Sequence, residues 1–277
     1  MELWYTEEQT PSLRLSCKVR ETLTTAQTPY QHLAIIDTEA FGPMLVLDGM
    51  VMTTIADEFV YHEMISHPAL FTHPCPRKVA VIGGGDGGAI REVLQHPQVE
   101  KAILAEIDGE VIAQSRKFLP EIAGALGNPK VEIHIGDGFA YLREHKGEFD
   151  IVLVDSTEPV GPAVALFSRD FYAAVYAALR PDGIMVAQTE SPFYNQEILA
   201  GAYKGMQAVF PKVHTYLASI PTYPSGLWSF TLASKQYDPL TNQRQPHPGF
   251  ISKYYTPELH RSCFVLPQFV RELLSRP

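Results

Sequence analysis

The strongest constraint on the fold is a regular alternation of short apolar runs with helical segments that starts near residue 79. Apolar runs of buried-strand length lie at 79–82, 102–105, 131–135 and 151–154. Each run precedes a segment with helical character, and these segments cover 87–96, 109–118, 138–145 and 168–179. Strands that alternate with helices in this way form a parallel sheet with helices on both faces. The pattern predicts a doubly wound α/β domain.

The C-terminal third of the chain extends the same domain. Further strands are predicted over 184–188, 213–218 and 227–234, with a helix over 195–210 before the last two. A short Pro-Gly turn separates the last two strands, which favours an antiparallel hairpin at the edge of the sheet. The segment 256–275 is expected to pack over the sheet as helix.

Residues 1–52 are predicted to form a small antiparallel β domain in front of the α/β domain, which then spans 53–277. Short alternating runs at 33–36 and 44–49 are punctuated by Gly and Pro, as expected for strands closed by turns. Thr54 and Asp57 resemble a capping box before the segment 59–65. That segment should be a helix that ends before Pro68.

Composition excludes several classes of protein. The chain has 277 residues, 45% of them hydrophobic, and its 31 acidic and 22 basic side chains give a formal charge of -9. An acidic chain without a Lys/Arg cluster is not expected to bind nucleic acid. No apolar stretch approaches the roughly eighteen residues of a membrane span. Three widely spaced cysteines and an N-terminus without a secretory signal favour the cytoplasm.

A glycine-rich loop lies between the first strand of the α/β domain and its first helix. The loop 83–88 satisfies the pattern G-x-G-x-x-G, and Glu106 follows at the end of the second strand. Glycines at this junction let a ligand approach the backbone, and the acidic residue accepts hydrogen bonds from ribose hydroxyls. The combination predicts a nucleoside site rather than a tight turn alone.

Asp86 within this loop narrows the choice of nucleoside. The loop lacks the Gly-Lys-Ser/Thr of a P-loop, and a carboxylate near a pyrophosphate would cost about 1–4 kcal/mol at ~4 Å. A nucleoside with a sulfonium centre therefore suits the loop better than NAD. Decarboxylated S-adenosylmethionine suits it best, because it carries a free ammonium group and no carboxylate. Taken alone, Asp86 is equally well explained as a cap for the following helix.

Two more acidic positions follow strand ends at the same edge of the sheet. Asp137 and Gly138 close the third strand, where Asp137 either contacts the exocyclic amine of an adenine or caps the next helix. Asp155 follows the fourth strand directly and opens the segment 155–162. Two prolines and a glycine in this segment predict a shaped loop that can close over a ligand.

The segment around His62 resembles a zinc-protease signature but lacks the second ligand. In H-E-x-x-H the second histidine would stand at position 66, which is Ser66. His67 is five residues from His62 and off the same helix face. We therefore predict no metal site, and the cysteines have no neighbour that suggests a thiolate nucleophile.

In combination these motifs resemble the spermidine synthase family of aminopropyltransferases, in particular its bacterial members. The resemblance extends from about residue 4 to 270 and rests on 61–64, 83–88, 91–94, 106–108, 155–162 and 220–226. It implies a Rossmann-like, methyltransferase-type domain behind the N-terminal β domain, assembled as a homodimer or homotetramer. The implied reaction transfers an aminopropyl group from decarboxylated S-adenosylmethionine to putrescine. Spermidine and 5′-methylthioadenosine would be the products, and no cofactor would be needed.

The resemblance also implies roles for individual residues. The donor would contact Gln31, Glu106, Asp137, Gly138 and Pro162, and Asp86 would hold its aminopropyl amine. Asp155 would accept the proton in a diamine site that also includes Asp86, Tyr61, His62, Ser156, Thr157, Glu158 and Tyr223.

Two other functions are compatible with the same scaffold. An amine N-methyltransferase would use intact S-adenosylmethionine, whose carboxylate Asp86 disfavours. A polyamine-binding protein without catalytic activity would not need both Asp86 and Asp155. Each function predicts a different outcome when the chain is incubated with putrescine and either donor: methylthioadenosine, S-adenosylhomocysteine, or no nucleoside product.

Overall fold

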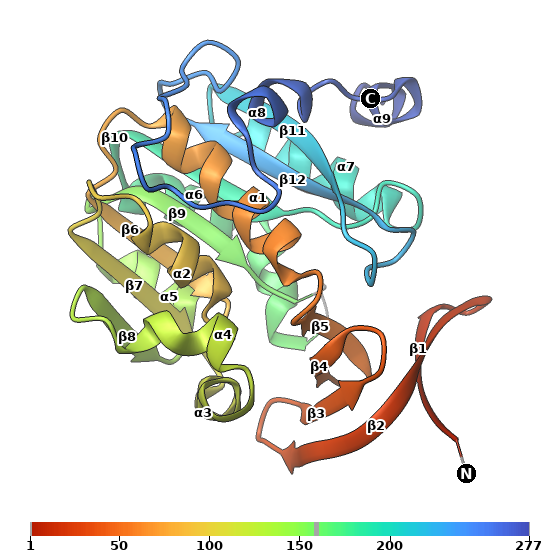
Figure 1. The fold of residues 1–277 in the computed structure, drawn as a ribbon. Coiled ribbons are helices and arrows are strands. Elements are labelled where there is room, and N and C mark those ends of the chain that lie inside the picture. The colour runs from red at the N-terminus through yellow and green to blue at the C-terminus, as the bar shows by residue number, and fades with distance from the viewer. Residues whose placement is uncertain (1, 158–160, 277) are drawn as a thin grey trace.

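The fold combines a small antiparallel sheet with a larger mixed sheet, as the sequence predicts (Figure 1). The computed structural model describes residues 2–157 and 161–276. The N-terminal sheet has its strands in chain order and every neighbouring pair antiparallel. Its strands are β1 (Leu3–Thr10), β2 (Leu13–Gln27), β3 (His32–Thr38), β4 (Gly42–Leu47) and β5 (Met50–Thr54). β5 thus runs past residue 52, where the sequence places the domain boundary.

The larger sheet has seven strands in the order β11-β12-β10-β9-β6-β7-β8. Its parallel part consists of β6 (Lys78–Gly83), β7 (Lys101–Glu106), β8 (Val131–Ile135), β9 (Phe149–Asp155) and β10 (Leu179–Gln188). β12 (Leu227–Ser234) is antiparallel to both β10 and the edge strand β11 (Lys212–Ser219), which confirms the predicted hairpin. The chain fills the sheet from β6 to β8 on one side and returns on the other with β9. Open α/β sheets bind ligands at such a reversal.

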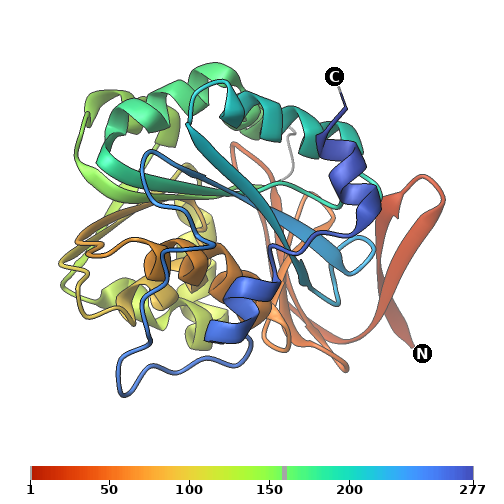
Figure 2. The ribbon, with the colours of Figure 1, turned by 90° about the horizontal axis from the view of Figure 1, so that it is seen from above.

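Helices cover both faces of this sheet (Figure 2). Successive residues of β6 point to opposite faces, so Val81 packs in one apolar cluster with α1 and α2, and Ile82 in another with α5 and α6. The helices are α1 (Glu58–Thr72), α2 (Gly88–Leu94), α3 (Gly109–Phe118), α4 (Pro120–Ala123), α5 (Gly138–Glu144), α6 (Arg169–Ala178) and α7 (Gln196–Gln207). Short 3-10 helices occupy Gly124–Gly127 and Gly161–Phe167. The predicted C-terminal helical segment forms two short helices, α8 (Pro257–Ser262) and α9 (Gln268–Leu274).

The N-terminal sheet docks against α3 and α4 through a separate apolar cluster. Leu33 and Leu45 of the sheet are fully buried in this cluster against Leu119 and Ile122. The sheet is thereby held beside the carboxyl ends of β6, β7 and β9, where the loops of the α/β domain lie (Figure 1). Within the described part of the chain, no helix combines the length and apolar character that a membrane span requires.

The prediction that α1 ends before Pro68 is wrong, because the helix continues to Thr72 with Pro68 inside it. A proline has no N–H for the carbonyl four residues earlier, here that of Met64. The hydroxyl of Tyr216, on β11, donates to this carbonyl at 2.7 Å and replaces the missing bond. Nearly every residue of α1 is buried, so tertiary packing also offsets the cost of the proline.

The predicted capping box at Thr54 and Asp57 forms only in part: the Asp57 N–H donates to Thr54 Oγ1 at 3.3 Å, but Thr54 is not the N-cap residue. Asp57 is itself the N-cap residue of α1 and makes no side-chain cap bond. Its Oδ2 instead accepts hydrogen bonds from the backbone N–H and the hydroxyl of Thr222, at 3.0 and 2.7 Å. Thr54 donates to Oδ1 at 2.6 Å. Asp57 therefore ties the start of α1 to the 220–226 turn.

We predict that Tyr216→Phe lowers the free energy of unfolding by about 1–3 kcal/mol, because it leaves the buried Met64 carbonyl without a donor. Pro68→Ala supplies a backbone N–H to the same carbonyl. The Pro68→Ala/Tyr216→Phe double variant should therefore lose less stability than the two single changes would suggest. Denaturant unfolding of the four proteins measures this coupling, and strict additivity would contradict the account.

Candidate active site

A cavity of about 390 Å³ lies where the N-terminal sheet meets the carboxyl ends of β6, β7 and β9. Every described residue that was assigned to the site from the sequence lines it: Gln31, Tyr61, His62, Asp86, Glu106, Asp137, Gly138, Asp155, Ser156, Thr157 and Tyr223. Glu158 lies outside the described residues, as does the side chain of Pro162. The individual roles of these residues remain predictions.

The glycine loop is shaped by its close approach to β9. Gly83 and Gly84 have φ of 78° and 71°, in the left-handed region. A Cβ on Gly83 would lie 2.2 Å from the backbone oxygen of Asp155, and one on Gly84 would lie 2.6 Å from Asp155 Oδ2. Glycine at these two positions therefore lets the loop lie directly against the Asp155 carboxylate.

Glu106 is fixed at the end of β7 by two backbone donors. Its Oε2 accepts from Gly85 N–H at 3.1 Å and its Oε1 from Asp108 N–H at 2.9 Å. Burial raises the pKa of Glu106 to about 7, against the opposing effect of these two N–H groups. A carboxylate held in this way retains lone pairs for the hydroxyls of a ribose.

Asp155 is the end residue of β9 and has an unsatisfied oxygen. Its Oδ1 accepts a 2.7 Å hydrogen bond from the hydroxyl of Tyr61, on α1. Its Oδ2 is buried and has no hydrogen-bond partner among the residues that the structure describes. Burial, followed by repulsion from Asp86, raises the pKa of Asp155 to about 6. A buried carboxylate oxygen without a donor indicates a place for a ligand that brings one.

Asp86 is held by a backbone donor and a histidine. Its Oδ1 accepts from Gly88 N–H at 2.8 Å and lies 3.3 Å from Nε2 of His62. Burial opposes its ionisation, but His62 outweighs burial and lowers the pKa of Asp86. The contact with Gly88 shows that Asp86 also braces the turn before α2, the local role that the sequence left open.

Asp137 makes local contacts, whereas Gln31 contacts a residue far along the chain. Asp137 caps α5, where its Oδ1 accepts from the backbone N–H groups of Phe139 and Ala140 at 2.8 and 3.3 Å. The capping role that the sequence offered for Asp137 is therefore confirmed, and its contact with adenine stays a prediction. Gln31 donates to Asp108 Oδ2 at 2.9 Å, which ties the β2–β3 turn to the end of β7.

Aromatic side chains line both this cavity and a second one of about 40 Å³, and the two cavities share several lining residues, including Tyr61 and Tyr223. The rings of Tyr61 and Tyr223 lie 5.6 Å apart, and Tyr223 contacts Trp228 at 4.8 Å. The Tyr223 hydroxyl donates to the carbonyl of Met52 at 2.6 Å.

The N-terminal sheet contributes residues to the main cavity that sequence reasoning missed. These residues come from β4 and β5, and they are Leu45, Leu47, Met50 and Met52. The alternating pattern of these strands indicates only that their apolar residues face a core. No signal in the sequence shows that part of this core opens onto a cavity.

The histidines of α1 bind separate partners. His67 contacts His96 at 3.1 Å through Nδ1 and lies 3.2 Å from Glu92, away from His62. Glu63 accepts three backbone N–H groups from Lys253, Tyr254 and Tyr255 at 2.7–2.9 Å and so anchors the C-terminal segment.

One group of potential metal ligands occurs in the described residues: His73, Asp150 and Asp182. Asp150 is the second residue of β9, at the opposite end of the strands from the cavity. Its carboxylate already accepts from Arg180 and from two backbone N–H groups.

Comparison with known proteins agrees with this geometry. The family model described as "Spermine/spermidine synthase domain" matches residues 58–245, and the one described as "Spermidine synthase tetramerisation domain" matches residues 3–54. The polyamine aminopropyltransferase of Caldicellulosiruptor bescii is 58% identical over 275 residues, 99% of each chain. That of Bacillus cytotoxicus is 54% identical over 275 residues, 99% of this chain and 100% of its own.

Solved structures give the same answer for the fold. A crystal structure of spermidine synthase from Thermotoga maritima superposes with a TM-score of 0.94 at 43% identity, covering 98% of this chain and 94% of its own. A spermidine synthase in complex with the transition state analogue AdoDATO superposes with a TM-score of 0.95 at the same identity and coverage. The chain therefore belongs to the spermidine synthase family, whose members are polyamine aminopropyltransferases.

Proposed function

We propose that this aminopropyltransferase uses decarboxylated S-adenosylmethionine as donor and putrescine as acceptor, and that it releases spermidine and 5′-methylthioadenosine. The observation that carries the proposal is Asp155, whose Oδ1 is held by Tyr61 while its buried Oδ2 has no partner within residues 2–157 and 161–276. The similar spermidine synthase that was solved with the transition state analogue AdoDATO supports the same site chemistry by analogy.

The charges in the cavity match the two substrates. Asp86 would hold the ammonium group of the donor, with Glu106 on the ribose and Gln31, Asp137, Gly138 and Pro162 around the nucleoside. Asp155 would hold the attacking end of the diamine, between Tyr61 and Tyr223, with Ser156, Thr157 and Glu158 beside it. Ser156 has a buried hydroxyl for which the described part of the chain offers no partner, so it too can take a hydrogen bond from the diamine.

The proposed step is an in-line displacement at carbon. The lone pair of the putrescine nitrogen forms the new N–C bond with the aminopropyl group as the C–S bond breaks. Its electron pair returns to sulfur, which becomes the neutral thioether of methylthioadenosine. The proton released by the amine passes to Asp155. Because the sulfonium is already a good leaving group, the step as written needs no metal or cofactor.

The environment of Asp155 narrows the energetic gap for this proton transfer. An alkylammonium has a pKa near ~10 and an ordinary aspartate one near ~4, a difference of about 8 kcal/mol. With the pKa of Asp155 raised to about 6, the gap falls to about 5 kcal/mol. The adjacent sulfonium lowers the pKa of the amine further, because like charges disfavour the protonated form.

Incubation with putrescine and each donor, followed by mass spectrometry of the nucleoside product, tests the reaction. We expect methylthioadenosine and spermidine from decarboxylated S-adenosylmethionine, and no S-adenosylhomocysteine from intact S-adenosylmethionine. Formation of S-adenosylhomocysteine would indicate methyl transfer. If cadaverine or spermidine is used with a higher kcat/KM than putrescine, that amine and not putrescine is the acceptor.

We predict that Asp155→Asn reduces turnover by about two to four orders of magnitude, because the amide cannot take the proton. The affinity for methylthioadenosine should stay within about twofold, since Asp155 lies on the acceptor side. Calorimetry with methylthioadenosine and steady-state kinetics separate these effects. Near-normal turnover would remove Asp155 from the mechanism.

We predict that kcat/KM falls as the pH drops through about 6, since Asp155 must be ionised to accept the proton and its raised pKa lies there. Tyr61→Phe removes the hydroxyl that stabilises the ionised carboxylate, so this acid limb should move to higher pH. Tyr223→Phe is the matched control, because that hydroxyl donates to Met52. Equal acid limbs in all three proteins would contradict the assignment.

We further propose that the chain assembles as a homotetramer through its N-terminal sheet, in the cytoplasm. The match to a tetramerisation domain supports this, as do the exposed Leu3 and Trp4 on β1, which are 57% and 56% accessible. Light scattering coupled to size exclusion should give four times the chain mass. The double variant Leu3→Ser/Trp4→Ser should have a lower measured mass, because its assembly is weakened. An unchanged tetramer would place the interface elsewhere.

A further inference from the structure

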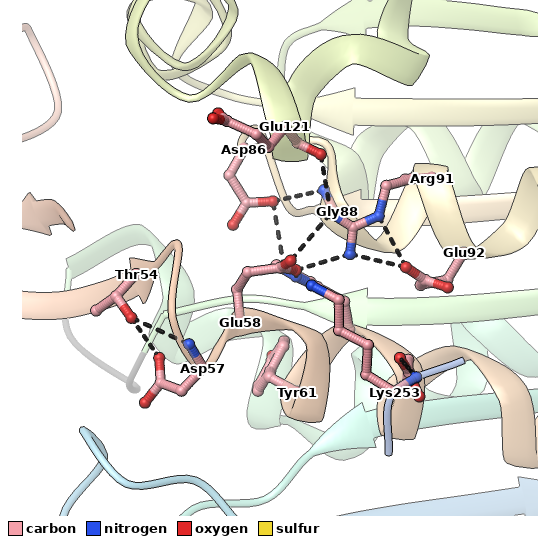
Figure 3. Close-up of polar contacts among 12 residues, drawn as sticks. Thr54, Asp57, Glu58, Tyr61, Asp86, Gly88, Arg91, Glu92, Glu121 and Lys253 are labelled. Atoms are coloured by element: carbon pink, nitrogen blue, oxygen red, sulfur yellow. Dashed lines mark hydrogen bonds and ion pairs between the residues drawn. The ribbon is translucent and has the colours of Figure 1, made fainter. Parts of the chain in front are cut away.

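A chain of buried charges runs from Asp86 into the interface between α1 and α2. His62 is 1% exposed, and its Nδ1 lies 2.6 Å from Glu58 Oε2 while its Nε2 lies 3.3 Å from Asp86 Oδ1. Glu58, also buried, accepts from two nitrogens of Arg91 at 3.0 and 2.8 Å. Figure 3 shows Arg91 lying between Glu58 and Glu92.

The geometry around His62 requires both ring nitrogens to carry a proton. A neutral imidazole has one N–H and one lone pair. Whichever nitrogen lacked the proton would point a lone pair at a carboxylate oxygen, at 2.6 Å on one side or 3.3 Å on the other. An imidazolium instead donates a hydrogen bond to Glu58 and forms an ion pair with Asp86. Burial opposes this charge, but Asp86 and Glu58 outweigh it and hold the pKa of His62 well above 6.5.

This arrangement has a consequence for Asp86. Among the described residues, the Gly88 N–H and His62 both contact the same carboxylate oxygen of Asp86, Oδ1. Two donors on one oxygen fix the side chain, and Oδ2 is left for a ligand in the cavity that Asp86 lines. The doubly protonated ring has no lone pair for an amine, so His62 reaches the substrates through Asp86 and not as a direct ligand of the diamine.

We propose that Glu58 is a positioning residue for the donor: through His62 it holds Asp86 charged and oriented so that Oδ2 receives the donor's ammonium group. This proposal rests on the function proposed above. Arg91 supports Glu58 from behind, since it balances the carboxylate that His62 needs as a partner. The resemblance to the family places His62 in the site, but it implies no role for Glu58.

The variant Glu58→Gln tests the proposal with little change of shape. The amide oxygen of the introduced glutamine can still accept a hydrogen bond from His62 Nδ1, but it no longer stabilises the positive ring. His62 should then lose its second proton as the pH rises, which leaves a lone pair facing Asp86. We expect the affinity for decarboxylated S-adenosylmethionine to fall about tenfold at pH 8.5 and to return to within about twofold of wild type at pH 6.

The readout is the ratio of two affinities measured by calorimetry between pH 6 and 8.5. Methylthioadenosine lacks the aminopropyl ammonium, so its affinity should be unaffected by the variant. The charged groups that face His62 are Glu58 on α1, Asp86 after β6 and Asp155 on β9, with Arg91 on α2 behind Glu58. Because the raised pKa of Asp155 is also about 6, each variant is compared with wild type at the same pH.

Glu92→Gln is the matched control. Glu92 is buried, and its Oε1 accepts a 2.8 Å hydrogen bond from Nε of the same Arg91, on the side away from His62. This variant should keep the wild-type affinity ratio at every pH. Thermal unfolding of both variants reports whether the fold is intact.

A measurement on the protein with Glu58 intact covers the case in which Glu58→Gln does not fold. Nitrogen-15 spectra of histidine-labelled protein, with His62→Gln used to assign the signal, should show the His62 ring doubly protonated from pH 6 to 8.5. A neutral His62 ring at pH 7.5 would overturn the proposal. So would a Glu58→Gln protein that keeps the wild-type ratio or weakens both ligands equally. Failure of the wild-type protein to bind the donor would instead overturn the proposed function, and this inference with it.

Discussion

The site depends on the repulsion between two carboxylates that the fold brings to the ends of neighbouring strands. Asp86 lies after β6 and Asp155 ends β9, and these two strands pair directly at the point where the sheet order reverses. Their proximity contributes to the raised pKa of Asp155, after burial. Two cations would relieve this repulsion on binding, whereas phosphates would add to it. The proposed substrates are therefore ones that these two carboxylates favour.

Helix α1 supplies the groups that control both carboxylates. Tyr61 donates to Asp155, and His62 contacts Asp86 from the next position in the chain. The helix is buried almost throughout, so neither side chain can move without disturbing the core. The helix is also tied to distant segments, by Asp57 to Thr222 and by Met64 to Tyr216. Catalytic geometry and core packing are thus carried by the same element.

Much of this arrangement could be predicted from the sequence because it is encoded locally. The glycine loop and Glu106 lie within one strand-helix-strand unit, and strand periodicity places Asp155 on the same edge. The errors at Pro68 and Asp57 arose where distant residues replace local bonds. No short-range pattern shows that Tyr216 supplies a donor to Met64, or that Asp57 binds Thr222. The contact between His62 and Asp86 required the structure for the same reason.

The preference of the cavity for a donor without a carboxylate is the central claim, and calorimetry tests it most directly. Wild-type protein and Asp86→Asn are each titrated with decarboxylated and with intact S-adenosylmethionine. The account predicts that wild type favours the decarboxylated donor by about tenfold or more, and that Asp86→Asn loses most of this preference. Equal affinity of the wild-type protein for both donors would contradict it.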